Sequence, residues 1–173
     1  MRRPDQYDYA MILLFLTLIC GSILLVRNHE QKENPALREQ NILVWKTIES
    51  GTYGNTNDIR KALVSNGFKI EYWANDALRK TPVSREKTRL ELVLVSAGQL
   101  GFNDWVTYKD IYERAQELGL KLVPAETGPQ LRLQYPTQPK DEWLHIAMEP
   151  LIASDGDPTI FDVMYNSHHA HNG

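Results

Sequence analysis

The chain has 173 residues, of which 42% are hydrophobic and 24% charged, and its formal net charge is -3. These values are typical of a folded globular protein and exclude a chain that is disordered throughout. The charge is slightly negative and the sequence holds no sustained basic stripe, which argues against a nucleic-acid-binding protein, because lysine and arginine contacts with phosphate dominate that affinity.

An uncharged apolar run, AMILLFLTLICGSILLV, occupies residues 10–26. A helix crosses a bilayer with about 20 apolar residues, and about 17 to 25 are tolerated. We therefore predict a transmembrane helix over residues 9–26, after an N-terminal tail of residues 1–8. The alternative is a cleaved secretory signal led by Arg2 and Arg3, but no small-residue cleavage site follows Val26.

This run predicts a single-pass membrane protein. The positive charges on its two sides are nearly balanced. Arg2 and Arg3 lie before the run, and Arg27, Lys32 and Arg38 lie after it. A short tail with leading arginines favours an N-terminus inside the cytoplasm. We accordingly expect the remainder of the chain to lie outside the cytoplasm.

The sequence pattern predicts helices in the first half of the remaining chain. Residues 27–41 are predicted to form a juxtamembrane stem, in which Asn34 and Pro35 start a helix that continues to Gly51. Two shorter helices follow, the first between the turn of residues 51–56 and Asn66, and the second with an apolar face within residues 73–78. Two helices joined near a glycine resemble a helix-turn-helix, but Glu71, Asn75 and Asp76 would face outward and meet phosphates with acidic groups.

Strands dominate the second half. Alternating apolar residues predict strands at 89–96 and 131–135, and a hairpin of residues 142–152 with residues 159–165. Between them, Thr107 and Asp110 form a capping box for a helix that ends at Gly119. The predicted fold is α+β: residues 42–166 form one domain in which three or four helices pack on a small, mainly antiparallel sheet, and residues 167–173 are a flexible tail.

Polar residues of the second half supply the candidate binding surface. We expect a surface formed by the outward face of the terminal hairpin and the AETGP loop, with an exposed tryptophan as contact anchor. The candidate residues are Glu126, Arg132, Trp143, His145 and Glu149.

No cofactor or metal site is expected. The sequence contains no phosphate-binding loop and no metal-protease or paired-cysteine motif. His168, His169 and His171 lie in a terminal tail that has no second shell to fix metal ligands, so metal binding there would be adventitious.

Three segments, WANDAL at residues 73–78, residues 106–135 and EWLHIAMEPL at residues 142–151, resemble those of a family of small bacterial proteins. The AETGPQLRLQY stretch is the most distinctive, and the resemblance covers residues 45–163. The family has no established activity, so the resemblance implies no catalytic residues.

The function predicted from the sequence is a membrane-anchored binding or interaction domain for a protein or cell-envelope ligand. One alternative is a cell-envelope hydrolase that uses Glu126, His145 or Glu149. A second alternative is a nucleic-acid-associated module that faces the cytoplasm. Nothing in the sequence fixes the oligomeric state.

Overall fold

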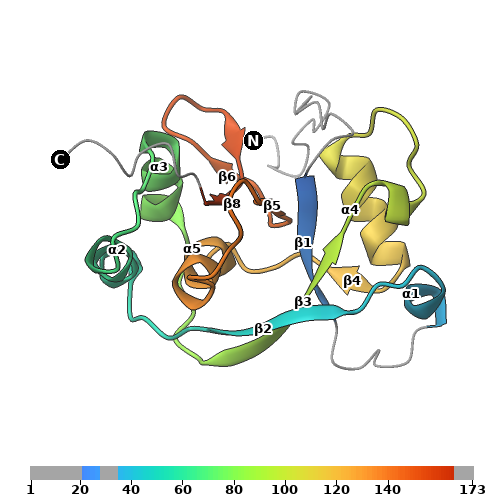
Figure 1. The fold of residues 1–173 in the computed structure, drawn as a ribbon. Coiled ribbons are helices and arrows are strands. Elements are labelled where there is room, and N and C mark those ends of the chain that lie inside the picture. Colours follow the sequence, from blue (N-terminus) through green and yellow to red (C-terminus); the bar gives the residue numbers. More distant parts are fainter. Residues whose placement is uncertain (1–20, 28–34, 166–173) are drawn as a thin grey trace.

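The structure is a computed structural model that describes residues 21–27 and 35–165. Within these segments the fold is α+β, with a curled sheet and five α-helices (Figure 1). The helices are α1 (Pro35–Glu39), α2 (Thr56–Ser65), α3 (Tyr72–Lys80), α4 (Tyr108–Glu117) and α5 (Thr127–Gln134), and a short 3-10 helix, η3, spans Gly98–Leu100. The strands are β1 (Gly21–Arg27), β2 (Val44–Ser50), β3 (Thr88–Val95), β4 (Leu120–Lys121), β5 (Trp143–Ile146), β6 (Leu151–Ile152), β7 (Pro158–Thr159) and β8 (Asp162–Met164).

The main sheet has the strand order β2-β3-β1-β5-β8, and β4 also pairs with β1. β1 runs antiparallel to β3 and parallel to β5, whereas β8 runs antiparallel to β5. Strands β6 and β7 form a separate two-stranded sheet. Within the described residues, β2 and β8 each pair with a single strand of the main sheet and therefore lie at the two ends of this order.

The transmembrane helix predicted over residues 9–26 is wrong. Residues 21–26 belong to β1, which is hydrogen-bonded between two neighbours in the middle of the sheet. Ile23, Leu24 and Leu25 are each at most 1% exposed. Among the described residues, no helix is long and apolar enough to cross a membrane. The predicted single-pass membrane localisation is corrected accordingly, whereas residues 9–20 lie outside the described residues.

β1 divides the interior into two hydrophobic cores, one on each face of the sheet. Leu24 points into a core formed with α2, α3 and α5, and Ile23 and Leu25 point into a second core formed with α1 and α4. Figure 1 shows these two groups of helices on opposite sides of β1. Leu37 of the predicted stem is buried in the second core, so this part of the stem packs within the domain.

Both α2 and α4 begin after a capping residue, and the sequence predicted the one before α4. Asn55 caps α2, accepting a hydrogen bond from the backbone N–H of Asp58. Thr107 and Asp110 form the expected capping box of α4. A capping side chain satisfies backbone donors that have no partner within the helix, which explains why these starts are visible in the sequence.

Two elements differ from the prediction. The helix expected to run from Pro35 to Gly51 ends at Glu39, and residues 44–50 form β2, which pairs with β3. The strand expected at residues 131–135 falls in α5 and its C-terminal end.

The terminal hairpin keeps its predicted partners, because Trp143 pairs with Met164 and His145 with Asp162. After Ile146, however, the chain leaves β5, and the smaller β6–β7 sheet follows.

Candidate functional site

Glu126 lies in the interior just before α5, with 1% of its surface exposed. Its Oε1 accepts hydrogen bonds from the Ser50 hydroxyl at 2.9 Å and the Ser84 backbone N–H at 3.0 Å. Oε2 accepts weaker bonds from the Gly51 backbone N–H at 3.4 Å and from Nε2 of Gln130 at 3.5 Å. The carboxylate thus joins the end of β2, the segment before β3 and the start of α5. These contacts give the residue a structural role.

Arg132 projects from the last turn of α5 between two aromatic rings. Its guanidinium carbon is 4.3 Å from the ring centroid of Phe68 and 5.6 Å from that of Tyr165. Nη1 donates a hydrogen bond to Oε1 of Gln138 at 3.0 Å. Burial lowers the pKa of Arg132, which indicates that its charge is partly removed from water.

His145 is the centre of a small polar cluster on the other face of the sheet. Its Nδ1 lies 2.7 Å from Oδ1 of Asp162 and 3.4 Å from the hydroxyl of Tyr108. The ring stacks on Trp143, with 5.9 Å between the ring centroids. Burial, and secondarily the charge of Asp162, raise the pKa of Tyr108 well above its usual range. This phenol therefore stays neutral across the physiological range.

An apolar groove of about 450 Å³ lies along β8. One wall comes from α3 and the segment before it and includes Phe68 and Trp73, and α5 supplies Gly128 and Arg132. The other wall is β8 and the residues before it, together with Trp143. Trp73 is 57% exposed and Trp143 is 44% exposed, so large aromatic surfaces are open at the groove. Such a concave apolar surface with a few polar groups is typical of a binding site.

Gly128 sets how closely α5 approaches the strand that lines the groove. A β-carbon at this position would lie 2.7 Å from Cβ of Phe161 and 3.0 Å from its Cγ. These distances are well inside van der Waals contact, so only glycine permits this approach without a shift of the helix or the strand. The shape of the groove between α5 and Phe161 therefore depends on glycine at position 128.

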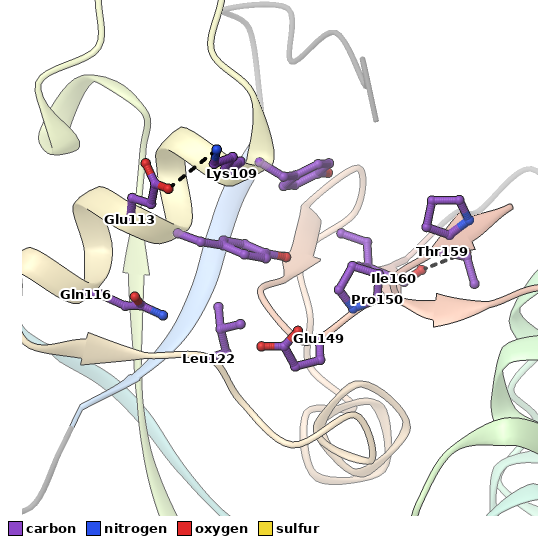
Figure 2. A pocket seen from close by; sticks show the side chains of 11 residues that line it. Lys109, Glu113, Gln116, Leu122, Glu149, Pro150, Thr159 and Ile160 are labelled. Atoms are coloured by element: carbon purple, nitrogen blue, oxygen red, sulfur yellow. Dashed lines mark hydrogen bonds and ion pairs between the residues drawn. The ribbon is translucent and has the colours of Figure 1, made fainter. Parts of the chain in front are cut away.

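A smaller cavity of about 190 Å³ lies between α4 and the residues around β6 and β7. Tyr108 and Tyr112 line one side, and Pro150 and Pro158 line the other. Figure 2 shows Glu113 turned toward Lys109 above the cavity, whereas Glu149 lies on the opposite side, near Leu122. This cavity has less than half the volume of the groove.

The structure places the five predicted site residues in different surroundings. Arg132 and Trp143 line the same groove, and His145 stacks beneath Trp143. Glu149 lines the smaller cavity, and Glu126 lies in the interior. Among the described residues, the ring nitrogens of His145 contact only the side chains of Tyr108 and Asp162, so no serine, threonine or cysteine nucleophile pairs with this histidine. The three residues of the predicted hydrolase therefore do not form one site.

A search of the described residues finds no group of three or more histidine, cysteine, aspartate or glutamate side chains placed to bind a metal ion. The predicted adventitious cluster of His168, His169 and His171 lies outside the residues that the structure describes.

Several groove residues were missed by the sequence analysis. Trp73 has the helical spacing of a core residue, yet its side chain is exposed at the groove. The sequence could have marked Asp162 as a candidate site residue, because aspartate is depleted in strands and here interrupts an apolar alternation. Phe68 had no such signal, since its position beside Arg132 depends on contacts between distant segments.

Comparison with models of known protein families, with curated proteins and with solved structures finds no match to this chain. The resemblance to a family of small bacterial proteins stays a prediction.

Proposed function

We propose that this protein is a binding domain that takes up an extended segment of a partner protein along the free edge of β8. The observation that carries the proposal is the position of the groove relative to this strand. Asp162 and Met164 lie on one face of β8 and Val163 on the other, because successive residues of a strand alternate. All three line the groove, so it follows the edge of the strand.

The backbone of β8 has groups available for pairing. Ile146 donates to the carbonyl of Phe161, which fixes the side that faces β5. Backbone groups alternate in an antiparallel pair, so those of Asp162 and Met164 face away from β5. Within the described residues, β8 pairs with no other strand. An extended segment can add to such an edge, while adjacent pockets select its side chains.

The apolar walls favour a protein segment as the ligand. Trp73, Trp143 and Met164 are large apolar residues with substantial exposure, and all three line the groove. Clustered exposed apolar surface marks binding sites on folded proteins. Trp143 of the predicted binding surface takes part, with Arg132 on the opposite wall.

The test is a selection of phage-displayed random dodecapeptides against the full chain, followed by a nuclear magnetic resonance titration with the selected peptides. We expect peptides with alternating apolar residues, and amide shift changes centred on residues 161–165 and around Phe68. Shift changes confined to the cavity beside Glu149, or no selected peptide, would contradict the proposal.

Two variants of Met164 distinguish the contribution of its backbone N–H to peptide binding from that of its side chain. Met164→Pro removes a backbone N–H that faces away from β5, so it should abolish peptide binding while pairing with β5 is kept. Met164→Thr keeps that N–H and should weaken binding by only a few-fold. Equal binding by both variants would exclude strand addition. Thermal unfolding of each variant checks that the fold is retained.

A further inference from the structure

We propose that the segment bound along β8 carries a carboxylate next to an apolar side chain, and that Arg132 binds this carboxylate. The inference rests on the proposed function and adds the chemistry of the partner, an acidic rather than a neutral or basic peptide.

Within the described residues, Arg132 differs from the other charged residues of the groove in having neither a charged group nor a histidine as its partner. Lys69 forms an ion pair with Glu71 at 2.8 Å, and Asp162 is bonded to His145 at 2.7 Å. In the part of the chain that the structure describes, no carboxylate lies within ion-pair distance of Arg132, whose hydrogen-bonding partner is the neutral amide of Gln138. Among the described residues that line the groove, Arg132 is thus a cation with no carboxylate in direct contact.

The cation of Arg132 is also partly buried. The guanidinium lies between the rings of Phe68 and Tyr165, and the side chain is half-buried. Removing a charge from water is costly unless a partner compensates for it. The stacked rings supply part of this compensation. An incoming carboxylate would supply the remainder, so an acidic ligand gains more from this site than a neutral one.

The guanidinium of Arg132 is held in place before a ligand binds. Gln138 is buried, and its Nε2 donates to the carbonyl oxygens of Val163 at 3.0 Å and Glu142 at 3.2 Å. Its Oε1 accepts from Arg132. Gln138 is therefore a positioning residue that fixes the arginine relative to β8. A fixed arginine loses little conformational freedom when its remaining donors bind a carboxylate.

A carboxylate fits better than a phosphate group. Recognition of phosphorylated peptides uses clusters of arginines, whereas among the described residues Arg132 is the one arginine that lines the groove. One guanidinium matches one carboxylate in a bidentate pair.

The experiment compares peptides selected from the dodecapeptide library by the wild-type chain with those selected by Arg132→Gln. We expect the wild-type chain to enrich an aspartate or glutamate at a fixed position, and the variant to lose this enrichment. Arg89→Gln is the matched control, because Arg89 is exposed outside the groove and its replacement changes the net charge equally. It should preserve the enrichment.

A double-mutant cycle then measures the contact. Replacing the enriched acid of a synthetic selected peptide by its amide should weaken binding to the wild-type chain by about tenfold, the effect of one hydrogen-bonded charge pair. The same replacement should have no effect on Arg132→Gln. Arg132→Lys should recover only part of the difference, because an ammonium cannot form the bidentate pair.

The outcomes separate the two proposals. Peptides that bind along β8 with no preference for an acid would overturn the role of Arg132 and leave the binding function intact. If no peptide binds along β8, both proposals fail. A concentration-dependent dimer in sedimentation equilibrium that is lost in Met164→Pro would overturn both as well, by assigning the groove to a second copy of the chain.

Discussion

His145 Nδ1 lies 2.7 Å from Asp162 Oδ1, so the outermost strand of the sheet is joined to its neighbour by a side-chain bond as well as by the backbone. An ionised carboxylate can only accept a hydrogen bond. When the imidazole is neutral, its proton must therefore be on Nδ1. The tautomer of His145 is thus fixed by Asp162.

Asp162→Ala should allow neutral His145 to adopt the other tautomer, with its proton on Nε2. With the carboxylate removed, Nδ1 keeps only the contact with the Tyr108 hydroxyl at 3.4 Å, and a hydroxyl can donate as well as accept. We expect long-range proton–nitrogen correlation spectra to show the Nδ1–H form in the wild-type chain and a larger Nε2–H fraction in the variant. Tyr108→Phe is the control and should leave the wild-type form unchanged. A predominant Nε2–H form in the wild-type chain would contradict this bond.

Glu126→Ala should destabilise the fold strongly. Four donors converge on this buried carboxylate, and each buried donor left without an acceptor costs about 1–3 kcal/mol. We expect urea denaturation to show a decrease of about 3 kcal/mol in the free energy of unfolding. Glu126→Gln, which keeps one acceptor oxygen, should have a smaller effect. If Glu126→Ala kept wild-type stability, the structural role of Glu126 would have to be abandoned.

The parts of the fold that were predicted correctly carry their signal in local sequence. Residues 56–65 have an apolar face that ends before Asn66 and Gly67, and residues 108–117 have a capping box before an apolar face, and these patterns predicted α2 and α4. Residues 88–95 alternate as a strand should and form β3. The capping bonds of the helices form within a few residues of the chain, and the alternation of β3 follows the two-residue repeat of a strand between two cores.

The errors arose where packing in three dimensions overrides the local pattern. Residues 21–26 were predicted to be part of a transmembrane helix because they belong to an uncharged apolar run. A strand that is covered on both faces has the same property. Residues 127–131 of α5 are all buried, so this helix shows no amphipathic period. The groove brings Phe68 beside Arg132, and no periodicity along one sequence encodes that contact.

The bond between Asp76 and Ser154 should make stability depend on pH in acid. The nearly buried carboxylate accepts from the Ser154 hydroxyl at 2.6 Å and its backbone N–H at 2.7 Å, and it pairs with Arg79 and Lys80. The bond from the Ser154 hydroxyl, followed by that from Arg79, holds the pKa of Asp76 far below its usual range. The folded state therefore binds this proton less readily than the unfolded chain does.

A depressed pKa stabilises the fold above the pKa of the unfolded chain, about 3.9 for aspartate, and this contribution is lost as the pH falls through the folded value. Asp76→Asn should lower the midpoint of thermal unfolding at neutral pH. The difference from the wild-type chain should stay constant above about pH 5 and shrink below about pH 4. Glu113→Gln, at an exposed pair, should change the midpoint little at any pH. A difference that grew on acidification would contradict the sign of this effect.

Leu24→Ala tests the reassignment of the apolar run most directly. Leu24 is fully buried and pairs with Leu94 of β3 and Ile146 of β5. Truncating such a leucine removes buried apolar surface and leaves a cavity, at a cost of about 2–5 kcal/mol. We expect a loss of that size in urea denaturation, whereas Val64→Ala at an exposed position of α2 should change stability by less than about 0.5 kcal/mol. If residues 21–26 lay outside the folded domain, the two variants would be equally stable, and the assignment of β1 to the centre of the sheet would be wrong.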